Sequence, residues 1–158
     1  MTKTNAMRLL DAAKKPYKIK TYVPNEDNVL PLDQVGQLDM IAEQVFKTLV
    51  TKNEKNIINV FCVPLNCELD LKKAAKISSS KKVEMVHVKD ILKLTGYVRG
   101  GCSPIGMKKK YATFIDETAI LFDEIGISAG LSGNEIVIEP NVLCEFVQSE
   151  FCDLTKEQ

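Results

Sequence analysis

Apolar residues follow the periods of helices and strands in turn along the chain. They recur every three or four positions in some segments, and every second position or in short continuous runs in others. Proline, glycine and asparagine separate many of these segments. The pattern predicts helices at 4–14, 68–77, 90–96 and 140–151, and strands at 17–22, 45–50, 57–63, 82–88, 111–115, 124–128 and 135–139.

The order of these elements indicates the fold class. A short polar turn at 53–56 joins the strands 45–50 and 57–63, which predicts a β-hairpin. The polar stretch 24–39 is expected to be a loop with at most a short helix. Because strands and helices are interspersed without a regular strand–helix rhythm, we expect one α/β (α+β) domain over 1–158. Its sheet would be mixed, either open or curled into a barrel.

Length and composition narrow the class of protein. The chain has 158 residues, of which 45% are hydrophobic and 27% are charged, as is usual for a soluble globular domain. Its apolar runs are too short to cross a bilayer. The polar, helix-patterned stretch 1–15 lacks the apolar segment of a secretory signal. We therefore expect a cytoplasmic protein with no membrane association.

The charges balance in number but not in distribution. There are 21 Lys+Arg and 21 Asp+Glu residues, which argues against general adhesion to nucleic acids or membranes. Lysines nevertheless gather at 14–20, 72–82 and 108–110. If these stretches share one face, that face favours phosphate groups and its binding weakens with salt. Otherwise they are solvated ends of separate elements.

Histidine and cysteine chemistry is sparse. The five cysteines are odd in number and contain no Cys-x-x-Cys, which predicts reduced thiols in the absence of an export signal. The chain offers neither a zinc ligand set nor a glycine-rich nucleotide motif, so we expect no metal and no cofactor. A histidine-assisted nucleophile would need His87, which the half-apolar run 86–88 predicts to be an ordinary strand residue.

The stretch 95–110, TGYVRGGCSPIGMKKK, has the most unusual composition. Its glycines permit positive φ and the close approach of a ligand, and Pro104 restricts the backbone around Ser103. Such a loop can direct several backbone N–H groups at a carbonyl oxygen or an oxyanion. The alternative is a plain turn between two strands.

Lys47 is a second candidate for chemistry. In VFKTLV (45–50), the two-residue period places Val45, Lys47 and Leu49 on one face of the strand. A lysine between apolar neighbours can be a partly desolvated cation that faces a phosphate or a developing negative charge. It can equally be an edge-strand lysine that discourages aggregation.

Together these segments resemble the YbaK/EbsC family. VFKTLV, the hairpin into 57–63, DLKKAAK (70–76), KKVEM (81–85) and TGYVRGGCSPIGMKKK occur in the order and spacing of that family, over almost the whole chain. Its members are aminoacyl-tRNA deacylases related to the editing domain of bacterial prolyl-tRNA synthetases. The chain is most similar to the branch that hydrolyses Cys-tRNA(Pro) and Cys-tRNA(Cys). The resemblance implies a mixed, barrel-like β-sheet flanked by helices.

The resemblance also implies roles for single residues. Lys47 would hold the 3′-terminal adenosine or a phosphate near the scissile ester, and backbone N–H groups of Gly100 and Gly101 would hold the aminoacyl carbonyl. Two positions depart from the family, because relatives often have an aliphatic residue at Cys102 and Asp at Glu135, and their roles stay open. The substrate-binding positions implied are Tyr22, Thr48, Ser103, Pro104 and Ser128.

The chemistry of this branch is compatible with a chain that lacks a nucleophile–base pair. The thiol of the substrate attacks its own ester, so the protein supplies positioning and electrostatic stabilisation. The implied function is trans-editing of Cys-tRNA(Pro). The alternatives are an Ala- or Ser-specific deacylase that activates water, and a non-catalytic tRNA-binding or synthetase-associated module. Partners would be the acceptor end of aminoacyl-tRNA and prolyl-tRNA synthetase, since a neutral chain with two arginines should bind tRNA weakly.

Overall fold

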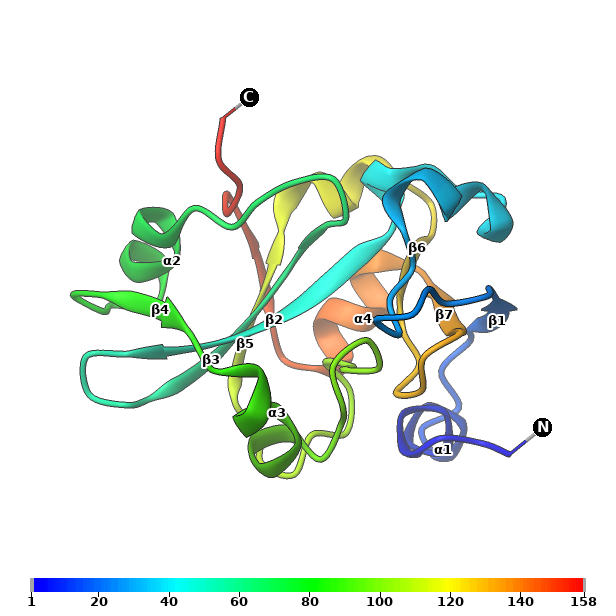
Figure 1. The fold of residues 1–158 in the computed structure, drawn as a ribbon, viewed down its shortest axis with the longest axis horizontal. Helices are drawn as coiled ribbons and strands as arrows, with labels where there is room; N and C mark the ends of the chain where they lie inside the picture. Colours follow the sequence, from blue (N-terminus) through cyan, green and yellow to red (C-terminus); the bar gives the residue numbers. More distant parts are fainter. Residues whose placement is uncertain (1, 158) are drawn as a thin grey trace.

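A computed structural model of the chain describes residues 2–157 and has short helices around its β-sheets (Figure 1). Within this part of the chain no helix is long and apolar enough to span a bilayer. The helices are α1 (Asn5–Ala12), η1 (Leu32–Leu38), η2 (Ala42–Gln44), α2 (Leu71–Ile77), α3 (Val88–Thr95), η3 (Glu117–Leu121) and α4 (Pro140–Phe146), where η marks a 3-10 helix. The strands are β1 (Lys18–Thr21), β2 (Phe46–Asn53), β3 (Ile58–Pro64), β4 (Val83–Met85), β5 (Ala112–Asp116), β6 (Ile125–Ser128), β7 (Asn134–Ile138) and β8 (Glu150–Cys152).

The strands of residues 2–157 are arranged in an antiparallel and a mixed sheet. The antiparallel sheet has the order β1-β7-β6, and the mixed sheet has the order β4-β2-β3-β5-β8. In the mixed sheet β2 is antiparallel to β3 and β4, whereas β5 is parallel to β3 and β8. An isolated bridge between Val45 and Gly126 joins the two sheets. The predicted mixed α/β architecture with flanking helices is confirmed.

The predicted hairpin corresponds to β2 and β3. Its turn is closed by Asn53, whose side-chain oxygen accepts hydrogen bonds from the N–H groups of Lys55 (2.9 Å) and Ile57 (3.0 Å). Asn56 takes a left-handed φ of 60°, which asparagine tolerates better than most residues. Local turn chemistry and apolar strands thus agree, which is why the sequence was sufficient to predict this unit.

The main apolar core lies between the antiparallel sheet and the helices α1 and α4. Met7 and Leu10 of α1 and Leu143 of α4 belong to one cluster with the isoleucines of β6 and β7. Each fully buried side chain of this size contributes about 1.5–3 kcal/mol. A second cluster beneath α2 contains Phe61 and Phe114, whose ring centroids lie 5.3 Å apart. Beyond these two cores, residues at the start of β2 line a cleft.

The predicted end of the last helix is wrong. The helix expected over 140–151 stops at Phe146, shortly before Gln148 takes a left-handed φ of 54°. The residues that follow form β8, in which Phe151 pairs with Ile115 of β5. Apolar residues spaced for a helix cannot indicate such a partner, because Ile115 is distant in the sequence.

The strand predicted at 82–88 is shorter than expected. β4 covers Val83–Met85 and pairs only with Thr51–Asn53, the end of β2. The next helix starts at Val88, with His87 at its N-cap position, rather than after Asp90. The apolar run was too short to show where pairing stops and the helix begins.

The lysine-rich stretches do not form one patch. Residues 72–76 lie in α2 and residues 18–20 in β1, and these elements are at opposite ends of the long axis (Figure 1). Residues 108–110 follow α3 in a separate loop. A single phosphate-binding face made of all three stretches is therefore absent from residues 2–157.

Candidate functional site

A cleft of ≈ 340 Å³ opens at the start of β2. This volume lies in the range of sites that hold small molecules or parts of larger substrates. Its walls come from β2, the loop before η1, the glycine loop after α3, and strands β6 and β7. The lining residues are Tyr22, Val29, Leu30, Val45, Phe46, Lys47, Thr48, Leu49, Leu65, Arg99, Gly100, Cys102, Ser128 and Glu135.

The pairing of β2 explains why the cleft lies here. β3 covers one edge of β2 along Phe46–Lys52, but β4 covers the other edge only from Thr51 onward. Val45 and the first half of β2 therefore border the cleft through five consecutive residues, 45–49. A short β4, which the sequence did not predict, is what leaves this edge open.

Lys47 is half-buried on the wall of the cleft. Its Nζ donates a long hydrogen bond of 3.4 Å to the carbonyl oxygen of Leu65. Burial lowers the pKa of Lys47 below its usual value of 10.5, because a charged ammonium is less stable away from water. A partly desolvated cation with one long contact is well suited to receive an anionic or carbonyl group.

Gly100 faces the cleft in a conformation that favours glycine. Its φ is +85°, and a Cβ at this position would overlap the carbonyl oxygen of Asn28 in the opposite loop. The same carbonyl accepts a hydrogen bond of 2.6 Å from the Ser132 hydroxyl. Three loops therefore meet at Gly100, and they leave no room for a side chain.

Tyr22, Thr48 and Ser128 add hydroxyl groups to the walls of the cleft. Burial raises the pKa of Tyr22 above 10.0, so its phenol stays a neutral donor. The Ser128 hydroxyl accepts a hydrogen bond of 3.2 Å from the N–H of Gly130, which orients it at the end of β6. The Thr48 hydroxyl lies 3.9 Å from the buried thiol of Cys62.

The other predicted site residues do not line the cleft. The N–H of Gly101 donates to the Val98 carbonyl at 3.0 Å, which closes a turn. Ser103 is fully buried, and its hydroxyl accepts a hydrogen bond of 3.2 Å from the N–H of Ile105. Pro104 lines a different pocket. The structure thus brings together Tyr22, Lys47, Thr48, Gly100 and Ser128 in the cleft, whereas Gly101, Ser103 and Pro104 do not line it.

Glu135 lines the cleft although the sequence did not indicate a role for it. It is only 5% exposed, and its Oε2 has no hydrogen-bond partner within residues 2–157. Burial raises its pKa to about 8, so the carboxyl is a proton carrier near neutral pH. The continuous apolar run 136–138 was a signal that could have predicted this burial. Such a run indicates a strand that is buried on both faces, so the Glu135 side chain has no solvent-exposed face to occupy.

Burial of Glu135 makes stability depend on pH. Between pH 4.5 and about 8, the Glu135 carboxyl keeps its proton in the folded state. In the unfolded state, where its pKa is the ordinary 4.5, it has lost that proton. The free energy of unfolding should therefore fall as pH rises from 4.5 to about 8, by about 1.4 kcal/mol per unit of pKa difference.

Glu135→Gln should remove this slope and be the more stable protein above about pH 8. Denaturant unfolding at several pH values measures the effect. The matched control is Glu139→Gln at the exposed end of the same segment, which should unfold as the wild type does. Parallel pH profiles of wild type and Glu135→Gln would contradict the assignment.

The cleft contains no pair of nucleophile and base of the usual kind. Burial raises the pKa of Cys102 to about 11, so its thiol is neutral and a poor nucleophile at neutral pH. His87 is exposed at the start of α3 and does not line the cleft. Within residues 2–157 no group of three His, Cys, Asp or Glu side chains could hold a metal ion. What the cleft offers is two cations, Lys47 and Arg99, together with hydroxyl donors and one buried acid.

The sequence places this chain among proteins that edit aminoacyl-tRNA. Residues 33–146 match the model of the aminoacyl-tRNA editing domain, and the chain belongs to this family. A relative from Enterococcus faecalis (strain ATCC 700802 / V583) is 42% identical over 156 residues, which are 99% of this chain and 95% of the relative. Its name is "Putative Cys-tRNA(Pro)/Cys-tRNA(Cys) deacylase EbsC". The resemblance found in the sequence is confirmed.

Solved structures agree on the fold. The crystal structure of "a putative trans-editing enzyme for prolyl tRNA synthetase" is similar with a TM-score of 0.83, at 21% identity, over 99% of this chain and 100% of that one. The crystal structure of a hypothetical protein also has a TM-score of 0.83, at 14% identity, over 94% of this chain and 97% of that one. The shared fold therefore extends over nearly the whole chain.

Proposed function

We propose that this protein is a single-domain trans-editing deacylase that cleaves the ester of Cys-tRNA(Pro) and Cys-tRNA(Cys). The observation that carries the proposal is the cleft itself, which combines the partly desolvated ammonium of Lys47 with the tightly packed Gly100 but offers no activated nucleophile. The 42% identical relative bears the name of such a deacylase. A reactive thiol supplied by the substrate would complete this site.

The proposed reaction begins within the aminoacyl group. The cysteinyl sulfur attacks the ester carbonyl, so a C–S bond forms while the C–O bond to the 3′-terminal ribose breaks. The thiol proton moves to the departing ribose oxygen, and a cyclic thioester of cysteine is released. Water then opens this ring to give cysteine. The protein holds the sulfur and the carbonyl in contact, and such positioning can lower a barrier by about 7–11 kcal/mol in favourable cases.

Five residues of the cleft have a proposed part in this step. The Lys47 ammonium holds the terminal adenosine or a phosphate beside the ester, and the backbone at Gly100 binds the carbonyl oxygen as negative charge develops on it. Tyr22, Thr48 and Ser128 bind the substrate through their hydroxyls. Since the Gly101 N–H is engaged in a turn, Ser103 is buried and Pro104 lines another pocket, these three residues keep the loop in shape.

The buried carboxyl of Glu135 permits two different roles, and one of them belongs to an alternative function. As an anion it would bind the α-ammonium of the aminoacyl group, which would complement its unpartnered oxygen. With a pKa of about 8 it could instead accept a proton from water, as a deacylase of Ala- or Ser-charged tRNA would require. The two roles differ in whether the substrate must carry a thiol.

Comparison of cysteine with serine as the attached amino acid tests the proposed function. Serine has nearly the same shape, but its hydroxyl is a much weaker nucleophile than a thiol. We expect Ser-tRNA(Pro) and Ala-tRNA(Pro) to be cleaved at least about 100-fold more slowly than Cys-tRNA(Pro). Without a thiol the reaction would need water activated by a general base, and such assistance is worth about 10²–10⁴-fold. Deacylation rates with labelled amino acids measure this. Equal rates for cysteine and serine would exclude thiol assistance and favour water activation by Glu135.

We further propose that the protein acts in the cytoplasm together with prolyl-tRNA synthetase. A synthetase pocket for proline cannot reject cysteine well, because one methylene is worth only about 1–3 kcal/mol, so errors need a second site. A chain with balanced charge should bind free tRNA weakly at physiological salt. Addition of the synthetase should lower the KM for Cys-tRNA(Pro). A tight complex of this chain with tRNA alone would contradict the need for that partner.

A further inference from the structure

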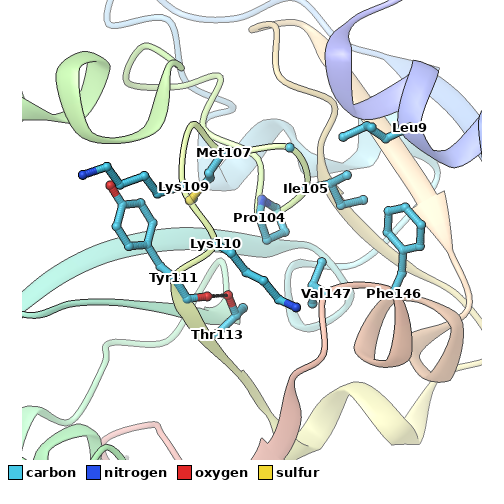
Figure 2. Close-up of a pocket in the computed structure, with 11 residues that line it drawn as sticks. Leu9, Pro104, Ile105, Met107, Lys109, Lys110, Tyr111, Thr113, Phe146 and Val147 are labelled. Carbon is cyan, nitrogen blue, oxygen red and sulfur yellow. Dashed lines mark hydrogen bonds between the residues drawn. The ribbon is translucent and has the colours of Figure 1, made fainter.

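A second pocket, of ≈ 230 Å³, lies behind the glycine loop (Figure 2). Ile105, Phe146 and Val147 form an apolar side, toward which Lys110 extends, whereas Lys109 extends in the opposite direction in this view. None of the functions assigned to the cleft uses this space. The lining residues are Leu9, Pro104, Ile105, Gly106, Met107, Lys109, Lys110, Tyr111, Thr113, Phe146 and Val147.

One continuous stretch of chain lines both the cleft and this pocket. Arg99, Gly100 and Cys102 face the cleft, and residues 104–107 and 109–111 face the pocket. The cleft and the pocket are therefore connected through one stretch of backbone, residues 99–111.

The lysine-bearing loop, residues 107–111, is held in place by its backbone and by Tyr111. The N–H of Lys108 donates to the Thr95 carbonyl at 3.0 Å, and the Tyr111 hydroxyl donates to the Leu94 carbonyl at 2.7 Å. The backbone that carries Lys109 and Lys110 is thus anchored to the end of α3. A preformed loop loses less conformational entropy when a ligand binds.

In the described part of the chain, the lysines of this loop have no acidic partner, in contrast to Lys18 and Lys73. Lys18 is paired with Glu124 at 3.2 Å, and Lys73 with Asp153 at 3.0 Å. Within residues 2–157, Lys108, Lys109 and Lys110 are all exposed and form no ion pair. Their charge is therefore uncompensated beside a pocket with one apolar side, which is an arrangement that suits a phosphate attached to a ribose or base.

We infer that this pocket, with Lys109 and Lys110, binds a nucleotide in the acceptor strand of the same aminoacyl-tRNA whose 3′ end occupies the cleft. The inference rests on the proposed function. The lysines contact phosphates, and the sugar or base packs on the apolar side formed by Ile105, Phe146 and Val147. Contacts of this kind position the tRNA without reading its sequence.

Two substrates of different length test the inference. The Lys109→Ala/Lys110→Ala double variant is assayed with full-length Cys-tRNA(Pro) and with a cysteinylated CCA trinucleotide, which lacks the rest of the acceptor strand. We expect the KM for the tRNA to rise about tenfold and the constants for the trinucleotide to stay unchanged. Each lost phosphate contact should also lower the slope of log KM against log salt by about 0.7–0.9.

Control variants separate charge from structure. Lys72→Ala/Lys76→Ala removes two exposed lysines of α2 that also form no ion pair within residues 2–157, and it should leave both substrates unaffected. Lys109→Arg/Lys110→Arg keeps the charge and should retain the wild-type KM for tRNA.

The remaining outcomes also decide the question. Equal losses on both substrates would mean that the loop only supports the cleft, and an unchanged KM for tRNA would mean that the lysines are merely solvated. Either result overturns the inference. If the wild type cleaves neither substrate, the proposed function fails. The binding of an uncharged acceptor-stem minihelix, measured by fluorescence anisotropy, then tests the pocket alone, and unimpaired binding by the double variant would overturn the inference.

Discussion

Replacement of Lys47 by alanine is expected to abolish detectable deacylation of Cys-tRNA(Pro), with kcat/KM lowered by at least about 10²–10³-fold. Losses of this size follow the removal of one charge-stabilising group from a preorganised site. Lys47 is the only lysine that lines the cleft within residues 2–157, and its Nζ has one long contact with the protein, so its charge is available to the substrate. Single-turnover rates with saturating protein would separate weaker binding from slower chemistry.

Lys52→Ala is the matched control for this experiment. Lys52 lies on the same strand, outside the cleft, and is paired with Glu84 at 3.7 Å near the surface. Its loss should cost less than about 1 kcal/mol of stability and leave deacylation unchanged. The fold should survive in Lys47→Ala, because burial lowers the pKa of this lysine and so opposes its charged form in the folded state. Full activity of Lys47→Ala would remove this residue from the proposed mechanism.

Gly100→Ala should be nearly as damaging, but through the backbone. A residue other than glycine at a φ of +85° is strained by about 1–3 kcal/mol, and here the new Cβ also overlaps the Asn28 carbonyl oxygen. The loop must move away, which displaces the backbone from the place where the ester carbonyl would lie. We expect kcat/KM to fall at least about 100-fold, since a shift of 1 Å can cost that much. Thermal unfolding should show a lower Tm.

Gly36→Ala provides the comparison. Gly36 lies in η1, has no heavy atom within 4 Å of a Cβ built on it, and is not in the left-handed region. This substitution should be neutral or slightly stabilising, because alanine has less conformational freedom in the unfolded chain. If Gly100→Ala behaved like Gly36→Ala in both activity and Tm, the three loops around Gly100 would not constrain the site.

These two variants address different parts of one mechanism. Lys47 supplies charge, whereas Gly100 supplies a shape that no side chain could share. The proposed reaction needs both, since the attacking sulfur belongs to the substrate and the protein can accelerate its attack only by holding it in place and stabilising the developing charge. A variant that keeps its Tm but loses activity would have a defect in charge stabilisation. A variant with a lowered Tm would have a defect in the shape of the site.

The sequence by itself determined the parts whose causes are local. The alternation in VFKTLV, the turn at 53–56 and the glycines of 95–110 were enough to predict the hairpin, to single out Lys47 and to indicate the loop that contains Gly100. Strand period, turn chemistry and positive φ depend on neighbouring residues, so they can be read along the chain. Together these segments also identified the family.

Only the tertiary structure decided which groups face one another. The pairing of Phe151 with Ile115 replaced the end of a predicted helix with a strand, and the short β4 left the edge of β2 open. Burial on both faces of β7 brought Glu135 into the cleft. These outcomes depend on contacts between segments far apart in the sequence. In such contacts, the cost of removing polar groups from water is offset by the hydrogen bonds that these groups gain. The net free energy is fixed only when the whole chain has packed.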